Sequence, residues 1–209
     1  YVGRYTPMNN TAIEIIASFG GDHVYDSSSA VNRDLTSDKI NLIPTNLTIS
    51  VPSSAVALDG FDVVVGLTNR TGQAVSGDVL VYVNGKLNAT LGGSGTVSLV
   101  PANDTDLHIY AVYAGDNSVY AGNTTGVKDV VVGLRPTNMS IVVPPTVSVA
   151  EEFAFSVSLV DNETANPISG KDLSVTVNGK DVSVVYDNGV YVGKYTPMNN
   201  TAIVIEASF

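Results

Sequence analysis

Nearly the same nineteen residues stand at the start and at the end of this chain of 209 residues. Residues 1–19 read YVGRYTPMNNTAIEIIASF and residues 191–209 read YVGKYTPMNNTAIVIEASF, so sixteen of nineteen positions are identical at a constant offset of 190. Repetition at a fixed period is the signature of a chain built from similar structural units. The fold must therefore be one that a single chain adopts several times in succession.

A weaker repeat divides this long period in two. PTNLTISV from Pro44 matches PTNMSIVV from Pro136 at an offset of 92, and PANDTDLHIYAVYAGD from Pro101 matches PMNNTAIVIEASF from Pro197. The repeating unit therefore has about 92–96 residues, and two units make the 190-residue period.

The repeats predict the division of the chain into domains. Residues 43–135 form one complete unit, residues 136–209 form a unit that lacks its last strand or strands, and residues 1–42 form the C-terminal part of a preceding unit. The overlap of the two ends favours a longer parent chain in which the units continue covalently. Head-to-tail strand complementation between separate molecules is the alternative.

Each unit has the pattern of short β-strands. Apolar and polar residues alternate over 46–51 and 107–113, which places every second side chain on one face. Asn-Gly pairs, which suit two-residue hairpin turns, occur at 84–85, 178–179 and 188–189. No stretch has the apolar period of a helix. The sequence therefore predicts an all-β protein of tandem immunoglobulin-like β-sandwich domains, with about seven strands in each unit.

Two short motifs add a family resemblance. YAGDNSVY at 113–120 and FGGDHVY at 19–25 each follow a predicted strand and precede a polar loop. In these motifs the chain resembles tandem bacterial and archaeal Ig-like repeats, and its cysteine-free, acidic, Asn- and Thr-rich composition is similar to that of adhesin-like cell-surface proteins of methanogenic archaea. The resemblance implies cell-surface display and stalk or filament formation, with adhesion as a further role, and it transfers no catalytic residues.

Composition restricts the partners. Twenty acidic residues against ten basic ones give a formal net charge of −10, which argues against binding to nucleic acid or to anionic membranes. No apolar run reaches the length needed to span a bilayer, so this segment is not expected to insert into a membrane. Cysteine is absent, which excludes disulfides and thiolate chemistry.

The sequence suggests no catalytic, cofactor-binding or metal site. His23 and His108 are the only histidines; His108 alternates with apolar neighbours on a predicted strand and is expected to point outward. The acidic clusters have no calcium-loop spacing and are more typical of solvated turns. They are Asp22 with Asp26, Asp34 with Asp38, and Asp104 with Asp106. We therefore expect a protein without enzymatic activity.

Asn-x-Ser/Thr sequons are frequent, and several recur at equivalent places in successive units. Most fall in predicted turns or at outward positions of strands, so they are candidates for N-glycosylation if the protein is secreted. The alternative is that Asn and Thr simply suit turns and exposed strand faces. The nine sites are Asn9, Asn46, Asn69, Asn88, Asn103, Asn123, Asn138, Asn162 and Asn199.

These observations favour an extracellular structural protein whose units form a cell-surface stalk, sheath or filament, by self-association or by head-to-tail continuation. The alternative is an adhesin whose sandwich loops bind glycans or a partner cell. For that alternative Tyr110, Tyr113 and Tyr120 are the aromatic residues that would form a flat sugar-binding surface, although tyrosines at alternate strand positions more often pack in a core.

Overall fold

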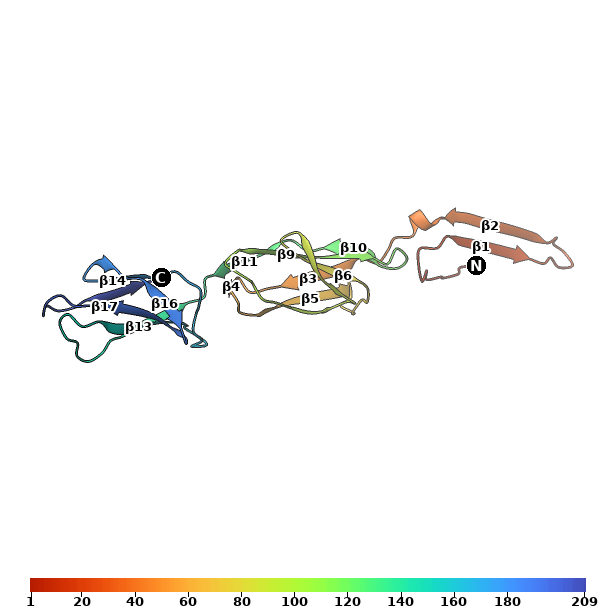
Figure 1. The fold of residues 1–209 in the computed structure, drawn as a ribbon. Helices are drawn as coiled ribbons and strands as arrows, with labels where there is room; N and C mark the ends of the chain where they lie inside the picture. Colours follow the sequence, from red (N-terminus) through yellow and green to blue (C-terminus); the bar gives the residue numbers. More distant parts are fainter. The chain divides into compact units, whose positions relative to one another are not determined.

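A computed structural model describes residues 1–209, and its regular secondary structure consists of β-strands apart from one 3-10 turn (Figure 1). The chain divides into two compact units, Tyr1–Gly133 and Leu134–Phe209. No helix is long and apolar enough to cross a lipid bilayer. The strands, with one short 3-10 turn η1 (Ser37–Lys39), are β1 (Ile13–Phe19), β2 (Ser28–Leu35), β3 (Thr45–Ser50), β4 (Ser54–Val56), β5 (Phe61–Asn69), β6 (Val79–Val83), β7 (Lys86–Leu91), β8 (Gly95–Leu99), β9 (Leu107–Gly115), β10 (Ala121–Thr124), β11 (Lys128–Gly133), β12 (Thr137–Val142), β13 (Phe153–Asp161), β14 (Ser174–Val177), β15 (Lys180–Asp181), β16 (Val184–Asp187), β17 (Val190–Tyr195) and β18 (Ile205–Ser208).

The first sandwich, residues 43–133, packs two sheets face to face. One sheet has the order β3-β5-β8, and the other has the order β4-β11-β9-β6-β7, with β10 also paired to β9. Alternate residues of β5 point into the core, where Val63, Val65 and Leu67 are almost fully buried. They meet Val79 and Ile109 from the opposite sheet in one apolar cluster. Period-two alternation in the sequence thus becomes burial between two sheets.

The second sandwich, residues 134–209, repeats this plan. One sheet has the order β12-β13-β17-β16 and the other has the order β15-β14-β18. Its core is built on Phe155, Val157 and Leu159 of β13, with Val175 and Val177 of β14 on the facing sheet. Leu159 stands 92 residues after Leu67, and both are fully buried. The prediction of an all-β protein with immunoglobulin-like sandwiches is confirmed.

Tight turns join the hairpins where Asn-Gly pairs occur. In β6–β7 the turn residues Asn84 and Gly85 have φ angles of 50° and 76°, as a type I′ turn requires. The pairs at 178–179 and 188–189 also have positive φ angles and join β14 to β15 and β16 to β17. These three turns set the register of the strands on either side.

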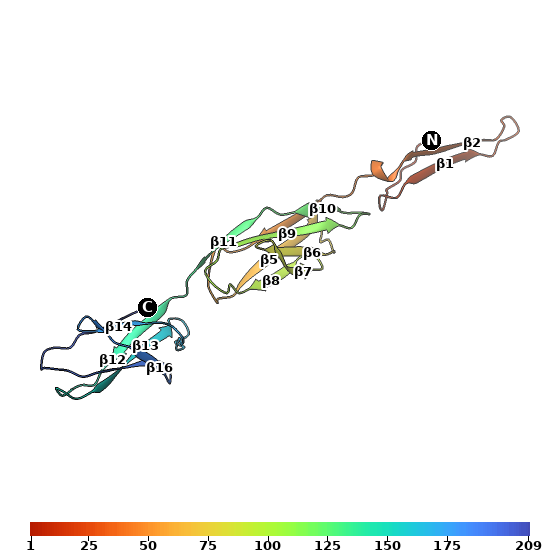
Figure 2. The ribbon, with the colours of Figure 1, turned by 45° about the horizontal axis from the view of Figure 1, so that its top comes forward.

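The N-terminal hairpin, β1 with β2, forms a separate two-stranded sheet (Figure 2). Both of its faces carry exposed apolar side chains, among them Ile15, Phe19 and Val31. Residues 203–209 nearly repeat β1, but in the second sandwich Ile203, Ile205 and Ala207 pack against the core. Nearly the same sequence is therefore an exposed hairpin strand in one place and packs against a sandwich core in the other.

Candidate functional site

Most of the sequons lie on the surface. Seven of the nine asparagines are exposed, which leaves room for a bulky substituent on the side-chain amide. The seven are Asn9, Asn46, Asn88, Asn103, Asn138, Asn162 and Asn199.

Three of these sequons share one local structure. The Oδ1 atoms of Asn9, Asn103 and Asn199 each accept a hydrogen bond from the backbone N–H of the sequon threonine, at 3.0–3.1 Å. This is the turn that an Asn side chain forms with the backbone two residues later. The turn uses the oxygen of the amide, so Nδ2 takes no part in this hydrogen bond.

The other two sequons are tied into the fold. Asn69 is 9% exposed, and its Oδ1 accepts hydrogen bonds from the backbone N–H groups of Thr71 and Gln73, while its Nδ2 donates to Gln73 Oε1. Asn123 is half-buried, and its Nδ2 donates to the carbonyl oxygen of Thr45 at 2.7 Å. A glycan on either nitrogen would displace a structural hydrogen bond.

The acidic residues of the two Gly-Asp motifs stabilise turns. Asp116 Oδ1 accepts hydrogen bonds from the backbone N–H groups of Ser118, Val119 and Tyr120, and these bonds lower the pKa of the carboxyl. Asp22 Oδ1 accepts two such bonds, from Val24 and Tyr25. The aspartate of each Gly-Asp motif therefore has a structural role. It accepts backbone N–H groups in the turn that follows β9 or β1.

The other acidic residues of the three clusters noted in the sequence, and both histidines, lie at the surface. Asp106 accepts a hydrogen bond from the backbone N–H of Val132, and Asp34 contacts Asn32. His108 is exposed on β9, with Nδ1 2.6 Å from a carboxylate oxygen of Asp129 on β11. No three His, Cys, Asp or Glu side chains of the chain come together in a group that could hold a metal ion.

The tyrosines of the first sandwich divide between its core and its outer face. Tyr113 is 2% exposed, and burial raises the pKa of its hydroxyl, with Asp116 and Tyr120 adding to the effect. Tyr120 is half-buried against the core. Tyr110 instead stacks on Tyr82 of β6, with ring centroids 4.9 Å apart and planes within 5°. Sequence reasoning missed Tyr82, which only the β6–β9 register pairs with Tyr110.

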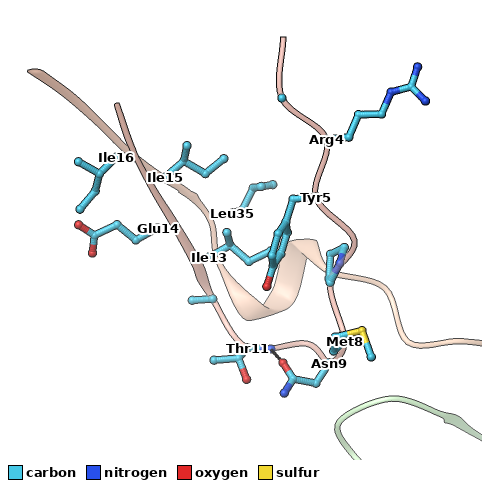
Figure 3. Close-up of a pocket in the computed structure, with 13 residues that line it drawn as sticks. Arg4, Tyr5, Met8, Asn9, Thr11, Ile13, Glu14, Ile15, Ile16 and Leu35 are labelled. Atoms are coloured by element: carbon cyan, nitrogen blue, oxygen red, sulfur yellow. Dashed lines mark hydrogen bonds between the residues drawn. The ribbon is translucent and has the colours of Figure 1, made fainter. Parts of the chain in front are cut away.

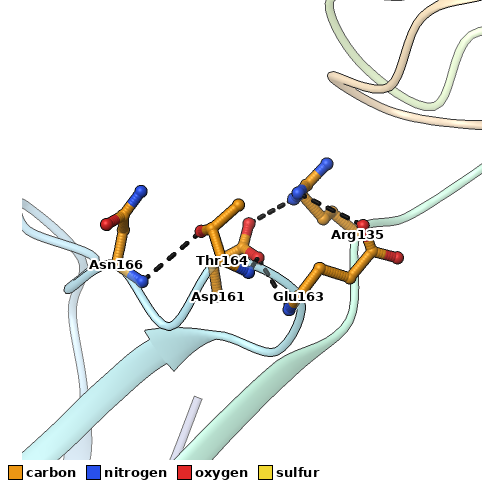
Figure 4. A network of polar contacts seen from close by, with 5 residues as sticks. All are labelled: Arg135, Asp161, Glu163, Thr164 and Asn166. Carbon is orange, nitrogen blue, oxygen red and sulfur yellow. Dashed lines mark hydrogen bonds and ion pairs between the residues drawn. The ribbon is translucent and has the colours of Figure 1, made fainter.

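A charged cluster secures the start of the second sandwich. Arg135, which precedes β12, forms ion pairs with Asp161 at the end of β13 and with Glu163, the latter at 3.3 Å (Figure 4). Asp161 Oδ1 also accepts hydrogen bonds from the N–H groups of Glu163 and Thr164. The guanidinium, together with these N–H groups, holds the pKa of Asp161 well below its ordinary value. Nothing in the sequence marked this cluster, because it depends on strand pairing.

One hollow lies near the N-terminus. Residues 3–9 fold back beside β1 and enclose an open space of about 890 Å³, lined by Tyr5, Met8, Ile13 and Leu35 among others (Figure 3). The residues equivalent to Tyr5 and Ile13 in the second sandwich are Tyr195 and Ile203, which pack against its core. The apolar lining thus repeats side chains that pack against a core in the second sandwich, so its apolar character needs no ligand to explain it.

A second hollow lies at the edge of the second sandwich. Beside β18 is an apolar groove of about 340 Å³. β18 pairs with β14 on one side and has no strand on the other. The groove is lined by Ile141, Val143, Pro144, Val147, Phe153, Ile203 and Ile205.

Comparisons with known proteins give distant structural neighbours only. No protein-family profile matches the chain, and no curated protein matches it in sequence. Among solved structures, the fibronectin(III)-like modules of Clostridium thermocellum CbhA align over 78% of this chain and 85% of theirs, at 12% identity and a TM-score of 0.36. The native conformation of E. coli alpha-2-macroglobulin aligns over 87% of this chain and 15% of its own, at 10% identity and a TM-score of 0.36.

Proposed function

We propose that the chain is a non-enzymatic structural repeat protein that forms an extracellular stalk, sheath or filament at the cell surface. The observation that carries this proposal is the repetition of one sandwich within one chain, with buried residues such as Leu67 and Leu159 at equivalent positions. Stacked copies of a domain extend a chain without requiring a ligand site in each copy. The resemblance to adhesin-like surface proteins of methanogenic archaea points in the same direction.

The connection between the sandwiches supports a load-bearing role. Only residues 134–136 separate the end of β11 from the start of β12. Pro136 restricts the backbone there, and Arg135 is held by Asp161 and Glu163. A short linker with a fixed proline and a paired arginine has little slack when the chain is pulled.

The exposed sequons support the extracellular placement. Seven accessible sites on 209 residues suit a protein that a secretory pathway glycosylates, and Asn46 and Asn138 occupy equivalent positions on β3 and β12. Glycopeptide mass spectrometry of the native protein should find glycans at exposed sequons such as Asn138 and none at Asn69. Native protein without any glycan would remove this support.

Immunogold electron microscopy tests the placement and the role together. Antibodies raised against the 1–209 polypeptide are applied to intact and to permeabilised cells of the source organism. Labelling of intact cells along extended surface structures is the expected result. Labelling that requires permeabilised cells would overturn the proposal.

The alternative, an adhesin that binds glycans, has one observation in its favour. The stacked rings of Tyr82 and Tyr110 lie on the outer face of the first sandwich, where a sugar ring can pack on aromatic carbon. On a glycan array, binding that is lost in Tyr82→Ala and Tyr110→Ala but kept in Tyr186→Ala would favour recognition. Tyr186 is the matched control because it is 37% exposed in the second sandwich. Absence of binding by the unsubstituted protein would favour the structural role alone.

A further inference from the structure

Three hairpin turns of the chain have the same central residues and the same backbone conformation. Each places Asn before Gly, at 84–85, 178–179 and 188–189. The three asparagines have φ angles of 50°, 50° and 45°, and the glycines that follow have φ angles of 76°, 73° and 93°. All three asparagines are exposed. The turns can therefore be compared by the contacts of their side-chain amides.

Two of these amides are fixed to a neighbouring segment. Asn84 Oδ1 accepts a hydrogen bond from the backbone N–H of His108 at 2.8 Å, and its Nδ2 donates to the carbonyl oxygen of Asp106 at 3.3 Å. Asn178 Oδ1 accepts the corresponding bond from the N–H of Val204, also at 2.8 Å. The backbone N–H groups of Asn84 and Asn178 donate to the carbonyl oxygens of the same two residues, His108 and Val204. Each asparagine is thus held by both its side chain and its main chain.

The third amide has no such contact. Asn188 lies in the turn between β16 and β17, next to the pair that Asp187 forms with Val190. Its side chain is exposed and makes no hydrogen bond with another residue of the chain. The amide of Asn188 is therefore free to approach the main chain of its own turn.

An asparagine that precedes a glycine can react with its own main chain, because glycine has no side chain to shield its nitrogen. The glycine nitrogen loses a proton to hydroxide and attacks Cγ of the asparagine. The new N–C bond closes a five-membered succinimide ring, and Nδ2 takes a proton from water and leaves as ammonia. A water molecule then opens the ring at either carbonyl carbon, which gives aspartate or isoaspartate. In sum, an amide and a water molecule become a carboxylate and an ammonium ion.

We propose that Asn188 is a site of spontaneous deamidation, and that the fold protects Asn84 and Asn178 from the same reaction. The attack requires Cγ to move towards the glycine nitrogen, so a hydrogen bond that fixes the amide elsewhere must break first. At Asn84 and Asn178 the Oδ1 contact opposes this movement, whereas Asn188 has no contact to lose. The inference is independent of the proposed structural role.

The two products alter the β16–β17 hairpin in different ways. A carboxylate at position 188 stands beside Asp187 and adds a negative charge to a chain whose formal net charge is already −10. Isoaspartate instead carries the main chain through the former side chain, which lengthens the turn by an additional carbon atom and disturbs the pairing of Asp187 with Val190. Tyr186 and Tyr191 form the next pair, with ring centroids 5.0 Å apart, so the second product should loosen this contact.

Peptide mapping by mass spectrometry tests the proposal on the 1–209 polypeptide. The folded protein is incubated in mildly alkaline buffer, and conversion of amide to acid is followed at all three Asn-Gly pairs. Asn188 should convert faster than Asn84 and Asn178 by about tenfold or more, because only at Asn188 does no hydrogen bond have to open.

The same incubation in concentrated urea separates protection by the fold from an effect of local sequence. Unfolding removes the contacts of Asn84 and Asn178, so the three rates should come close together. Equal rates in the folded protein would overturn the proposal. A preference for Asn188 that is unchanged in urea would also overturn it, because local sequence would then be its cause.

Ion-exchange chromatography of the aged protein gives an independent readout. The unsubstituted chain should develop a more acidic form, and Asn188→Gly should abolish it. Asn178→Gly is the matched control and should leave it, since glycine adopts the positive φ angle of either turn. An acidic form that survives Asn188→Gly would contradict the assigned site. Neither result affects the immunogold experiment, because the reaction requires only the turn and water.

Discussion

The side chains that hold the two sandwiches together recur 92 residues apart. Val65 and Val157, and Leu67 and Leu159, occupy the same places on β5 and β13, and all four are at most 2% exposed. Interiors are closely packed, so a side chain lost at such a position leaves a cavity that its neighbours fill only in part. Equivalent substitutions in the two sandwiches should therefore have similar effects.

Leu67→Ala and Leu159→Ala should each lower the free energy of unfolding of their own sandwich by about 2–5 kcal/mol. Denaturant titration followed by tyrosine fluorescence and circular dichroism measures the change. Val64→Ala is the control, because Val64 is 50% exposed on the same strand as Leu67. It should stay within about 0.5 kcal/mol of the unsubstituted chain, and an equal loss at Val64 would contradict the assigned core.

One polar position differs between the sandwiches and makes one of them sensitive to acid. Asn69 and Asp161 both end the long strand of their sheet and both accept backbone N–H groups, but only Asp161 carries a charge and binds Arg135. Since folding lowers the pKa of Asp161 below the ordinary value of 3.8, the folded state holds fewer protons there than the unfolded state. The stabilisation is therefore complete above that ordinary value and decreases as the pH falls below it.

Asp161→Asn should reduce the acid dependence of the second sandwich, because an amide keeps the turn but neither titrates nor pairs with Arg135. The measurement is the urea midpoint of unfolding between about pH 6 and about pH 2, where the unsubstituted chain should lose stability more steeply. Asp181→Asn, at an exposed acid of the same sandwich, serves as the control. Parallel pH curves for Asp161→Asn and the unsubstituted chain would show that the ion pair contributes nothing.

At the scale of secondary-structure elements, the backbone conformation of a two-residue hairpin turn depends on its two central residues. Gly85 has a φ angle of 76° and open space around its Cα atom, so an alanine there is strained by backbone conformation alone. Gly92, in the next connection, also has open space but no such φ angle. Comparing an alanine at these two positions therefore isolates the effect of backbone strain, because an added Cβ meets no atom within 4 Å at either position.

Gly85→Ala should destabilise the first sandwich by about 1 kcal/mol or more, whereas Gly92→Ala should be neutral or slightly stabilising. Thermal unfolding of the two variants under the same conditions measures the difference. Equal melting temperatures would mean that the Asn84-Gly85 turn does not constrain the β6–β7 hairpin.

Other elements exist only through their partners. β4 spans Ser54–Val56 because β11 lies beside it, while the equivalent residues 146–148 form no strand. β7 is continuous along β6, but its counterpart is divided: β15 pairs with β14, and β16 pairs with β17 in the other sheet. Local propensity is similar in each case, so pairing decides where these strands begin and end.

Across the chain as a whole, each sandwich has its own apolar cluster, and no buried residue is shared between the two clusters. Domains with separate cores unfold as separate cooperative units when little else connects them. The two sandwiches also differ in the number of strands that cover their cores. Their stabilities should therefore differ.

Differential scanning calorimetry of the 1–209 polypeptide should show two transitions. Leu67→Ala should shift one of them, and Leu159→Ala the other, each by several degrees. A single transition that both variants shift equally would show that the sandwiches unfold as one.

Much of the fold was readable from patterns within a few residues. Period-two alternation predicted the strands over 46–51 and 107–113, which the structure places at Thr45–Ser50 and Leu107–Gly115. Asn-Gly predicted the hairpin turns because the required positive φ angles depend on those two residues alone. The domain boundaries and the glycosylation sites remain predictions. The stacked tyrosines and the Arg135 cluster could not be found in this way, because each joins residues from different strands.

The amino-acid sequence alone determined the all-β class, the repeating unit and the turns, since these follow from side-chain alternation and local backbone preference. Tertiary structure decided which strands pair, and with that the burial of Tyr113, the stacking of Tyr82 on Tyr110 and the pairing of Arg135 with Asp161. The physical reason is visible in the repeated nineteen residues. An identical inward face is solvated in β1 and packed in the second sandwich, because burial depends on what lies opposite a strand.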